Sequence, residues 1–333
     1  MSLPQRSFRS SMALLAAFWL AACAAGPSAP PTPSPSPGGW ASPIGSSAVI
    51  PLIASSELAK GEERFLFTVI DQANHVVADP AVAVHLRFFD LASDPDRPAS
   101  QSDAVFFWII EGQRGLYRAS ATFSAAGQWG AELVISRSEA SGSPPPDAGP
   151  AGSSDPLASP VTVRIVFSVR EHPSTPAVGD TAPPADTPTL ETAGGDPRRI
   201  STDPDPDLRF YELSIRQALE SGRPFLLSFA TPAFCQTATC GPTLDVVKQV
   251  LADYPTLSAI HVEPYELAER DGALQRVFDA AGNPQPIPAV RTWGLVSEPY
   301  TFLVDAGGRV AARFEGAIDP TELREAIDAL LAG

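Results

Sequence analysis

The chain has 333 residues, and its 38 acidic and 23 basic side chains give a formal net charge of −15. This balance argues against a nucleic-acid-binding protein, because such proteins meet the phosphate backbone with a basic surface. The length suggests about two domains. The 36 prolines lie mostly in blocks, so part of the chain is expected to be linker.

The first 22 residues have the pattern of a secretory signal. Arg6 and Arg9 precede an apolar stretch, residues 11–22, that is too short to span a bilayer well. The stretch ends in "LAAC", which resembles the lipobox of bacterial lipoproteins. This resemblance implies a signal peptide over 1–22, a lipidated Cys23, and a lipid anchor on the extracytoplasmic face of the bacterial cell membrane. The alternative is an ordinary secretory signal with an incidental cysteine.

A tether and an all-β region follow the signal. Residues 23–46, rich in Pro and Ser, are predicted to be a disordered tether. Residues 47–170 contain runs of alternating apolar and polar residues, such as "RFLFTVID" (64–71) and "VAVHLRFF" (82–89). Turn residues separate the runs, so we predict an antiparallel β-sandwich. The Pro- and Gly-rich segment 141–156 is expected to be a surface loop within the last hairpin.

One stretch of the β-region carries a family resemblance. "GLYRASATFSAAGQWGAELVI" (115–135) contains a Gly-x-Tyr, Phe and Gly-x-Trp pattern. This pattern resembles small bacterial immunoglobulin-like domains of the YtkA and FixH type. The resemblance implies an immunoglobulin-like sandwich, and some domains of this type occur near copper proteins.

The remaining chain is predicted to be a second linker, residues 171–207, followed by alternating helices and strands. Ser214 with Gln217 predicts one helix N-terminus, and Asp319 followed by Pro320 predicts another. Further helices are predicted over 244–254 and 266–282, and strands over 225–230, 257–263 and 300–316, the last as two strands joined by a Gly-Gly turn.

The element order and three motifs resemble the thioredoxin fold over residues 208–333. "FLLSFATPAFC" (225–235) is similar to the strand that leads into the active cysteine of that family. "CGP" (240–242) matches the first three letters of the family's CGPC motif. "SEPYTFLVDAGGRV" (297–310) resembles the cis-proline loop and the terminal hairpin.

The resemblance implies an α+β multidomain chain, with an α/β thioredoxin-like domain following the immunoglobulin-like sandwich. Its reactive thiols would be Cys235 and Cys240, the even pair that remains once Cys23 is lipidated. Pro299 would be the cis-proline that shapes the substrate groove. In such a site one thiolate near a helix N-terminus attacks a disulfide, and the second cysteine resolves the mixed disulfide.

The spacing of Cys235 and Cys240 departs from the family, because they lie five residues apart instead of three. On a continuous helix their side chains would diverge by about 140°. They can meet only if the intervening "QTAT" is a non-helical loop. Either Cys235 is the nucleophile and Cys240 resolves, or Cys240 caps the helix and Cys235 is its partner. We favour Cys240 as the more acidic thiol, although the sequence leaves both registers open.

Other functions fit the same residues. The pair could be an inert disulfide staple, or, with His261, a copper site similar to that of Sco-type assembly proteins, since thiolates suit Cu(I). "TPAFCQTATC" also resembles a peroxiredoxin motif with one residue too many. A non-catalytic binding lipoprotein is a further alternative. We expect an extracytoplasmic thiol–disulfide oxidoreductase, without a cofactor, that acts on protein thiols or disulfides and is joined to the membrane by its lipid.

Overall fold

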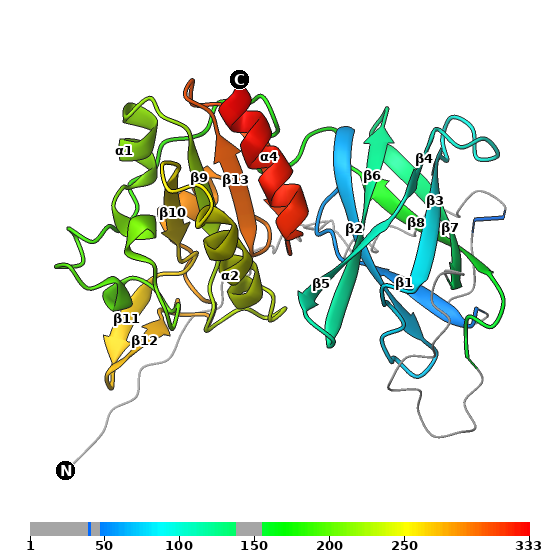
Figure 1. The fold of residues 1–333 in the computed structure, drawn as a ribbon, viewed down its shortest axis with the longest axis horizontal. Coiled ribbons are helices and arrows are strands. Elements are labelled where there is room, and N and C mark those ends of the chain that lie inside the picture. The colour runs from blue at the N-terminus through cyan, green and yellow to red at the C-terminus, as the bar shows by residue number, and fades with distance from the viewer. Residues whose placement is uncertain (1–38, 41–46, 138–154) are drawn as a thin grey trace, which may run out of the picture. The chain divides into compact units, whose positions relative to one another are not determined.

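The computed structural model describes residues 39–40, 47–137 and 155–333 (Figure 1). The predicted signal peptide, Cys23 and most of the tether lie outside the described residues, as does most of the loop 141–156. Ser36–Gly333 forms one compact unit. No helix in the described part of the chain is both long and apolar enough to cross a membrane.

The N-terminal region is built from two four-stranded antiparallel sheets. One sheet has the order β1-β2-β6-β5, with strands Val49–Ile53, Gly61–Asp71, Arg114–Phe123 and Val105–Ile110. The other has the order β4-β3-β7-β8, with strands Ser100–Asp103, Val82–Asp90, Gly127–Arg137 and Val161–Val169. The alternating runs predicted over 64–71 and 82–89 are present as strands β2 and β3. The short edge strands β1 and β4 had no such signal.

Alternation along the strands explains how the two sheets pack. Phe65 and Phe67 of β2 and Leu86 and Phe88 of β3 are fully buried in one apolar core, as their period-two spacing predicts. Trp129 of β7 lies in the same core and meets Phe123 at 4.9 Å between ring centroids. The aromatic positions of the 115–135 motif are thus core positions.

The C-terminal region is built around a mixed four-stranded sheet of order β10-β9-β13-β14. β10 runs parallel to β9, whereas β13 is antiparallel to both β9 and β14. The four strands are Ser258–Val262, Phe225–Phe229, Tyr300–Val304 and Val310–Glu315. Two helices cover each face of the sheet: α2 (Cys240–Leu251) and α4 (Pro320–Ala332) on one, and α1 (Ile215–Glu220) and α3 (Pro288–Thr292) on the other.

Local sequence signals place the helix starts. Ser214 caps α1 in a reciprocal capping box with Gln217, as predicted. The Asp319 side chain accepts from the backbone N–H of Thr321 at the start of α4, and Pro320 occupies the first helical position. Two 3₁₀ helices, Pro197–Arg199 and Leu208–Tyr211, and the short helix α3 were not predicted.

The helix predicted over 266–282 is wrong. The segment forms a hairpin of β11 (Leu267–Arg270) and β12 (Ala273–Arg276). Asp271 and Gly272 connect the two strands with φ of 53° and 76°. An Asp-Gly pair favours this left-handed turn, which brings the strands together and cannot continue a right-handed helix.

The prediction of a separate linker over 171–207 also needs correction. This segment has little regular structure but packs on the C-terminal sheet. Ala182 and Ala185 are buried in the core on the α1 side. The backbone of residues 179–182 bonds to the turn of the β13–β14 hairpin, with Gly179 N donating to the Val310 carbonyl at 2.8 Å. Its prolines prevent regular structure, but small side chains and these backbone bonds still hold it against the sheet.

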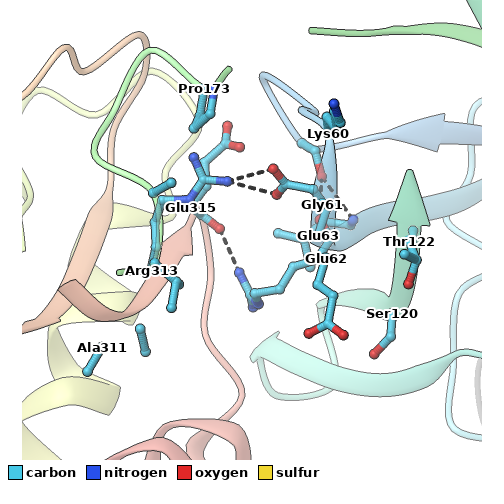
Figure 2. A pocket seen from close by; sticks show the side chains of 17 residues that line it. Lys60, Gly61, Glu62, Glu63, Ser120, Thr122, Pro173, Ala311, Arg313 and Glu315 are labelled. Carbon is cyan, nitrogen blue, oxygen red and sulfur yellow. Dashed lines mark hydrogen bonds and ion pairs between the residues drawn. The ribbon is translucent and has the colours of Figure 1, made fainter. Parts of the chain in front are cut away.

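Charged side chains join the sandwich to the C-terminal sheet. Arg313 of β14 donates to both carboxylate oxygens of Glu63 in β2 at 2.8 Å (Figure 2). Arg64 of β2 donates to both oxygens of Glu322 in α4, at 2.6 and 2.8 Å. Beside these pairs lies a cavity of about 580 Å³, bordered by Gly61, Thr122, Ala311 and Glu315 among others. A small apolar cluster completes the junction: Leu66, Phe107, Leu116 and Ala317.

Candidate active site around the cysteine pair

The loop that follows β9 brings Cys235 and Cys240 together as a disulfide, with their Cα atoms 5.9 Å apart. The loop is not helical, as the spacing required, and α2 begins only at Cys240. Ala238 adopts a left-handed conformation with φ of 55°, and its N–H donates to the Cys235 carbonyl at 3.3 Å. This tight turn returns the chain to Cys235 within the short span that separates the two cysteines.

The two sulfur atoms have different surroundings. Cys240 is fully buried, whereas Cys235 is half-buried. The Cys235 sulfur accepts the Cys240 backbone N–H at 3.3 Å and lies 3.3 Å from the Thr237 hydroxyl. The N–H belongs to the first residue of α2, where a helix favours negative charge. This geometry favours the first register, with Cys235 as the reachable thiol, over the more acidic Cys240 that we favoured from sequence.

Pro299 lies at the same edge of the sheet as the cysteine loop. The Glu298–Pro299 peptide bond is cis, as the motif predicted. Tyr300 pairs with Phe229, the last residue of β9, so Pro299 adjoins the point where the loop leaves the strand. Glu298 accepts a hydrogen bond from the Tyr265 hydroxyl at 3.2 Å. Burial raises the pKa of Glu298, and burial followed by the charge of Glu298 raises the pKa of Tyr265 to about 12.

The β11–β12 hairpin forms one wall beside this loop. The Arg276 guanidinium stacks over three rings, at 5.0 Å from the centroid of Phe234, 5.4 Å from Tyr265 and 5.5 Å from Phe278. Phe234 directly precedes Cys235. A continuous series of contacts therefore runs from the cysteine loop through Arg276 and Tyr265 to the cis-proline loop.

A residue of the sandwich also reaches the cysteine loop. Arg114, at the start of β6, donates from Nη1 to the Thr237 carbonyl at 2.6 Å. Neither Arg114 nor Arg276 could be identified from sequence, because no motif surrounds them. The only usable signal was the Asp271-Gly272 turn, which would have placed the hairpin carrying Arg276 correctly.

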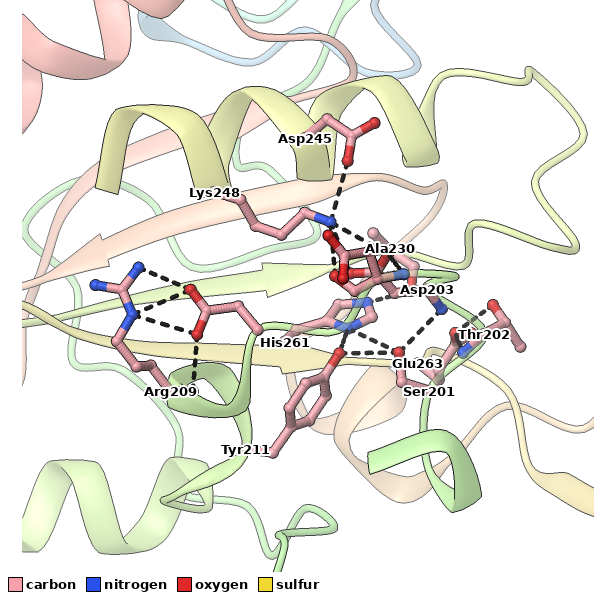
Figure 3. A network of polar contacts seen from close by, with 12 residues as sticks. Ser201, Thr202, Asp203, Arg209, Tyr211, Ala230, Asp245, Lys248, His261 and Glu263 are labelled. Atoms are coloured by element: carbon pink, nitrogen blue, oxygen red, sulfur yellow. Dashed lines mark hydrogen bonds and ion pairs between the residues drawn. The ribbon is translucent and has the colours of Figure 1, made fainter. Parts of the chain in front are cut away.

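His261, the predicted alternative metal ligand, is buried in a polar network beneath the loop (Figure 3). Its Nε2 donates to the Ala230 carbonyl at 2.9 Å, and the Tyr211 hydroxyl lies 2.8 Å from Nδ1. Burial lowers the pKa of His261, so the neutral ring is favoured. Both ring nitrogens thus have protein partners. The described residues hold no group of three or more His, Cys, Asp and Glu side chains arranged for a metal.

The same network supports the start of the cysteine loop. Thr202 accepts the backbone N–H of Ala233, two residues before Cys235, at 3.1 Å. The Thr202 N–H in turn donates to the Glu263 carboxylate at 2.7 Å. Glu263 is buried at the end of β10, and its second carboxylate oxygen has no hydrogen-bond partner. Lys248 of α2 donates to Asp203 at 2.9 Å and closes the network on the helix side.

Comparisons with known proteins identify no family. No family model and no curated protein matches the chain. Among solved structures, a match is found to MtrC from Shewanella baltica OS185, with 11% sequence identity and a TM-score of 0.22. The alignment covers 79% of this chain and 51% of MtrC, so the chain spans about half the length of that protein. A TM-score this low supports no inference about shared fold or function.

Proposed function

We propose that the C-terminal domain is a thioredoxin-like thiol–disulfide oxidoreductase that uses Cys235 and Cys240. The observation that carries the proposal is a disulfide at the N-terminus of α2, directly after the central strand β9 and beside a cis peptide bond at Pro299. The sheet order β10-β9-β13-β14, with only β10 parallel to β9, supports the thioredoxin-like fold.

The proposed reaction is a two-electron exchange. In the reduced protein the Cys235 thiolate attacks one sulfur of a substrate disulfide, which forms a mixed disulfide and expels the other substrate sulfur as a thiolate. The Cys240 thiolate then attacks the Cys235 sulfur. The bond to the substrate breaks, the Cys235–Cys240 disulfide forms, and the second substrate thiolate leaves and takes a proton from water.

The surroundings of each sulfur support this division of roles. The Cys240 N–H and the Thr237 hydroxyl, each 3.3 Å from the Cys235 sulfur, are donors that stabilise a thiolate there. Cys240 is buried, so a bulky substrate meets Cys235 first, while Cys240 is in place to resolve.

We propose the cellular setting from the N-terminal sequence. A lipid on Cys23 would anchor an immunoglobulin-like sandwich and the catalytic domain at the extracytoplasmic face of the membrane, where disulfides persist. The paired four-stranded antiparallel sheets support the immunoglobulin-like assignment. Mass spectrometry of membrane-extracted protein should find a diacylglyceryl group on Cys23, and an unmodified Cys23 would contradict the anchor.

Turnover of a model disulfide tests the catalytic proposal. Cys235→Ser and Cys240→Ser should each abolish turnover and leave the melting temperature of the reduced protein nearly unchanged. If the pair is only a staple, the wild type has no turnover, and reduction lowers the free energy of unfolding by about 2–3 kcal/mol. Titration of the reduced protein with Cu(I) is the remaining control, because tight binding that His261→Ala weakens would favour a copper site instead.

A further inference from the structure

We infer that Arg276 makes the site selective for substrate disulfides that carry carboxylate groups close to the reacting sulfur. The inference rests on the proposed function, since it specifies the substrate class of the same cysteine pair. It is carried by the position of the guanidinium next to Phe234, the residue before Cys235. It also rests on the lack of an ion pair between Arg276 and any carboxylate in the part of the chain that the structure describes.

The Arg276 guanidinium is held by rings instead of by a carboxylate. It stacks over Phe234, Tyr265 and Phe278 and forms no ion pair with any carboxylate of the described residues. Aromatic faces attract a cation without neutralising its charge. Glu298, which accepts a hydrogen bond from Tyr265, interacts with the Arg276 charge at longer range without forming an ion pair with it. The charge of Arg276 is therefore less completely offset than that of the arginines at the domain junction, which pair directly with Glu63 and Glu322.

Arg276 is also anchored well enough to act as a specificity group. Its β-strand pairs in register with β11, where Leu267 lies opposite Arg276. Three rings restrict the guanidinium, so less side-chain entropy is lost when it meets an anion. Arg114 adds a second cation at the other end of the loop, on the Thr237 carbonyl, and it also has no ion pair within the described residues.

The local charge contrasts with that of the whole chain. With a formal net charge of −15, the chain as a whole repels an anionic substrate at long range. A carboxylate beside the substrate disulfide would gain attraction from Arg276 as the Cys235 thiolate approaches. The same cation would offset the charge on the attacking and leaving sulfur atoms. A substrate with a basic residue in that place loses both effects.

Three matched peptide disulfides can test the inference. Each probe is a capped symmetric disulfide of a short peptide, identical except for Glu, Gln or Lys next to the cysteine. The reduced full-length protein is mixed with each probe, and the second-order rate constant of exchange is measured by quenched mass spectrometry. The variants are Arg276→Gln, Arg276→Lys and the control Arg270→Gln, which removes the same charge from the far end of β11, where no stacking partner holds it among the described residues.

The readout is the ratio of the rate constant for the Glu probe to that for the Lys probe, compared between protein variants. The intrinsic reactivity of each peptide is the same for all variants, so it does not affect this comparison. We expect Arg276→Gln to lower this ratio by about 3- to 10-fold, Arg276→Lys to retain most of it, and Arg270→Gln to leave it nearly unchanged. An equal change in Arg276→Gln and Arg270→Gln, or no change in either, would overturn the inference while leaving the exchange activity in place.

Failure of the proposed function looks different. A wild-type protein that exchanges with none of the probes contradicts the oxidoreductase and the inference together. If Arg276→Gln loses reactivity toward all three probes, the selectivity of Arg276→Lys is measured instead. A folded Lys variant with wild-type selectivity supports the charge of Arg276 as the specificity group, and one with lost selectivity contradicts it.

Discussion

A buried carboxylate in the sandwich and one in the C-terminal domain differ in how fully their oxygens are hydrogen-bonded. In the sandwich, Glu132 lies between Arg87 and Arg164, and each arginine donates to one of its oxygens. Burial acts to raise the pKa of Glu132, but these hydrogen bonds outweigh it and hold the pKa below its ordinary value. In the C-terminal domain, Glu263 has one oxygen bonded to Thr202 and one without a partner.

This contrast extends to other buried polar groups. Of the six side chains in the described residues that have a buried polar atom without a hydrogen-bond partner, five belong to the C-terminal domain: Thr231, Thr243, Glu263, Trp293 and Tyr300. Thr231 and Thr243 flank the cysteine loop. Buried polar groups without a hydrogen-bond partner are costly, and a functional role is one reason that proteins keep them. The difference agrees with our proposal that places the cysteine chemistry in the C-terminal domain.

Two tryptophan truncations should give the largest change in stability and test this contrast. Trp129→Ala in the sandwich and Trp293→Ala beneath the C-terminal sheet both empty a fully buried site. Each should lower the free energy of unfolding by about 3–5 kcal/mol in denaturant titrations. Only Trp293→Ala should change the rate at which dithiothreitol reduces the disulfide, because Trp293 packs on Phe229, 5.8 Å between ring centroids, at the entrance to the loop. Equal effects on that rate would contradict the separation of roles.

The junction between the two regions is the next test. Arg64→Ala removes the two-pronged partner of Glu322, and both side chains are less than one fifth exposed. Arg118, whose Nε lies 3.8 Å from the Glu322 carboxylate, still offsets part of the remaining charge. The substitution should therefore cost about 2 kcal/mol, less than a fully uncompensated buried charge. The control Lys60→Ala removes an exposed pair with Glu171 and should cost less than about 0.5 kcal/mol. Denaturant unfolding measures both, and similar losses would show that the junction pair contributes no more than a surface pair.

The smallest expected effect concerns His261 and pH. Burial lowers the pKa of His261 below its ordinary value of 6.5. Just below pH 6.5 the histidine is therefore protonated in the unfolded chain but stays neutral in the folded protein. The free energy of unfolding should therefore fall as the pH drops below about 6.5, by up to about 1.4 kcal/mol per pH unit. In His261→Gln this part of the slope should disappear. Identical slopes in the two proteins, measured by chemical denaturation between pH 7 and 5, would contradict the buried neutral ring.

Much of the framework could be predicted because local signals and tertiary packing agree. The alternation around Phe65 and Leu86 placed the sandwich strands, and Ser214 and Asp319 placed two helix starts. The cis bond at Pro299 followed from a motif. At these positions the residue type favours one structural role, such as capping a helix N-terminus or packing into the core.

The wrong predictions concern segments in which two features of the sequence favoured different structures. Over 266–282, helix-forming residues outweighed the Asp271-Gly272 turn, which decided the structure. Over 171–207, composition indicated a linker, but small buried side chains such as Ala182 fix the segment to the sheet. The surroundings of Cys235 depend on side chains distant in sequence, and spacing alone cannot give these. Arg114 lies more than a hundred residues from the Thr237 carbonyl that it contacts.

Trapping of the mixed disulfide tests the central claim most directly. Reduced Cys240→Ser and Cys235→Ser are each mixed with a model disulfide, and intact-mass spectrometry follows the adduct. Because the Cys235 sulfur is reachable and receives the α2 N–H while Cys240 is buried, Cys240→Ser should rapidly accumulate an adduct on Cys235, and Cys235→Ser should react much more slowly. An adduct that forms faster on Cys240, or on neither cysteine, would contradict the account.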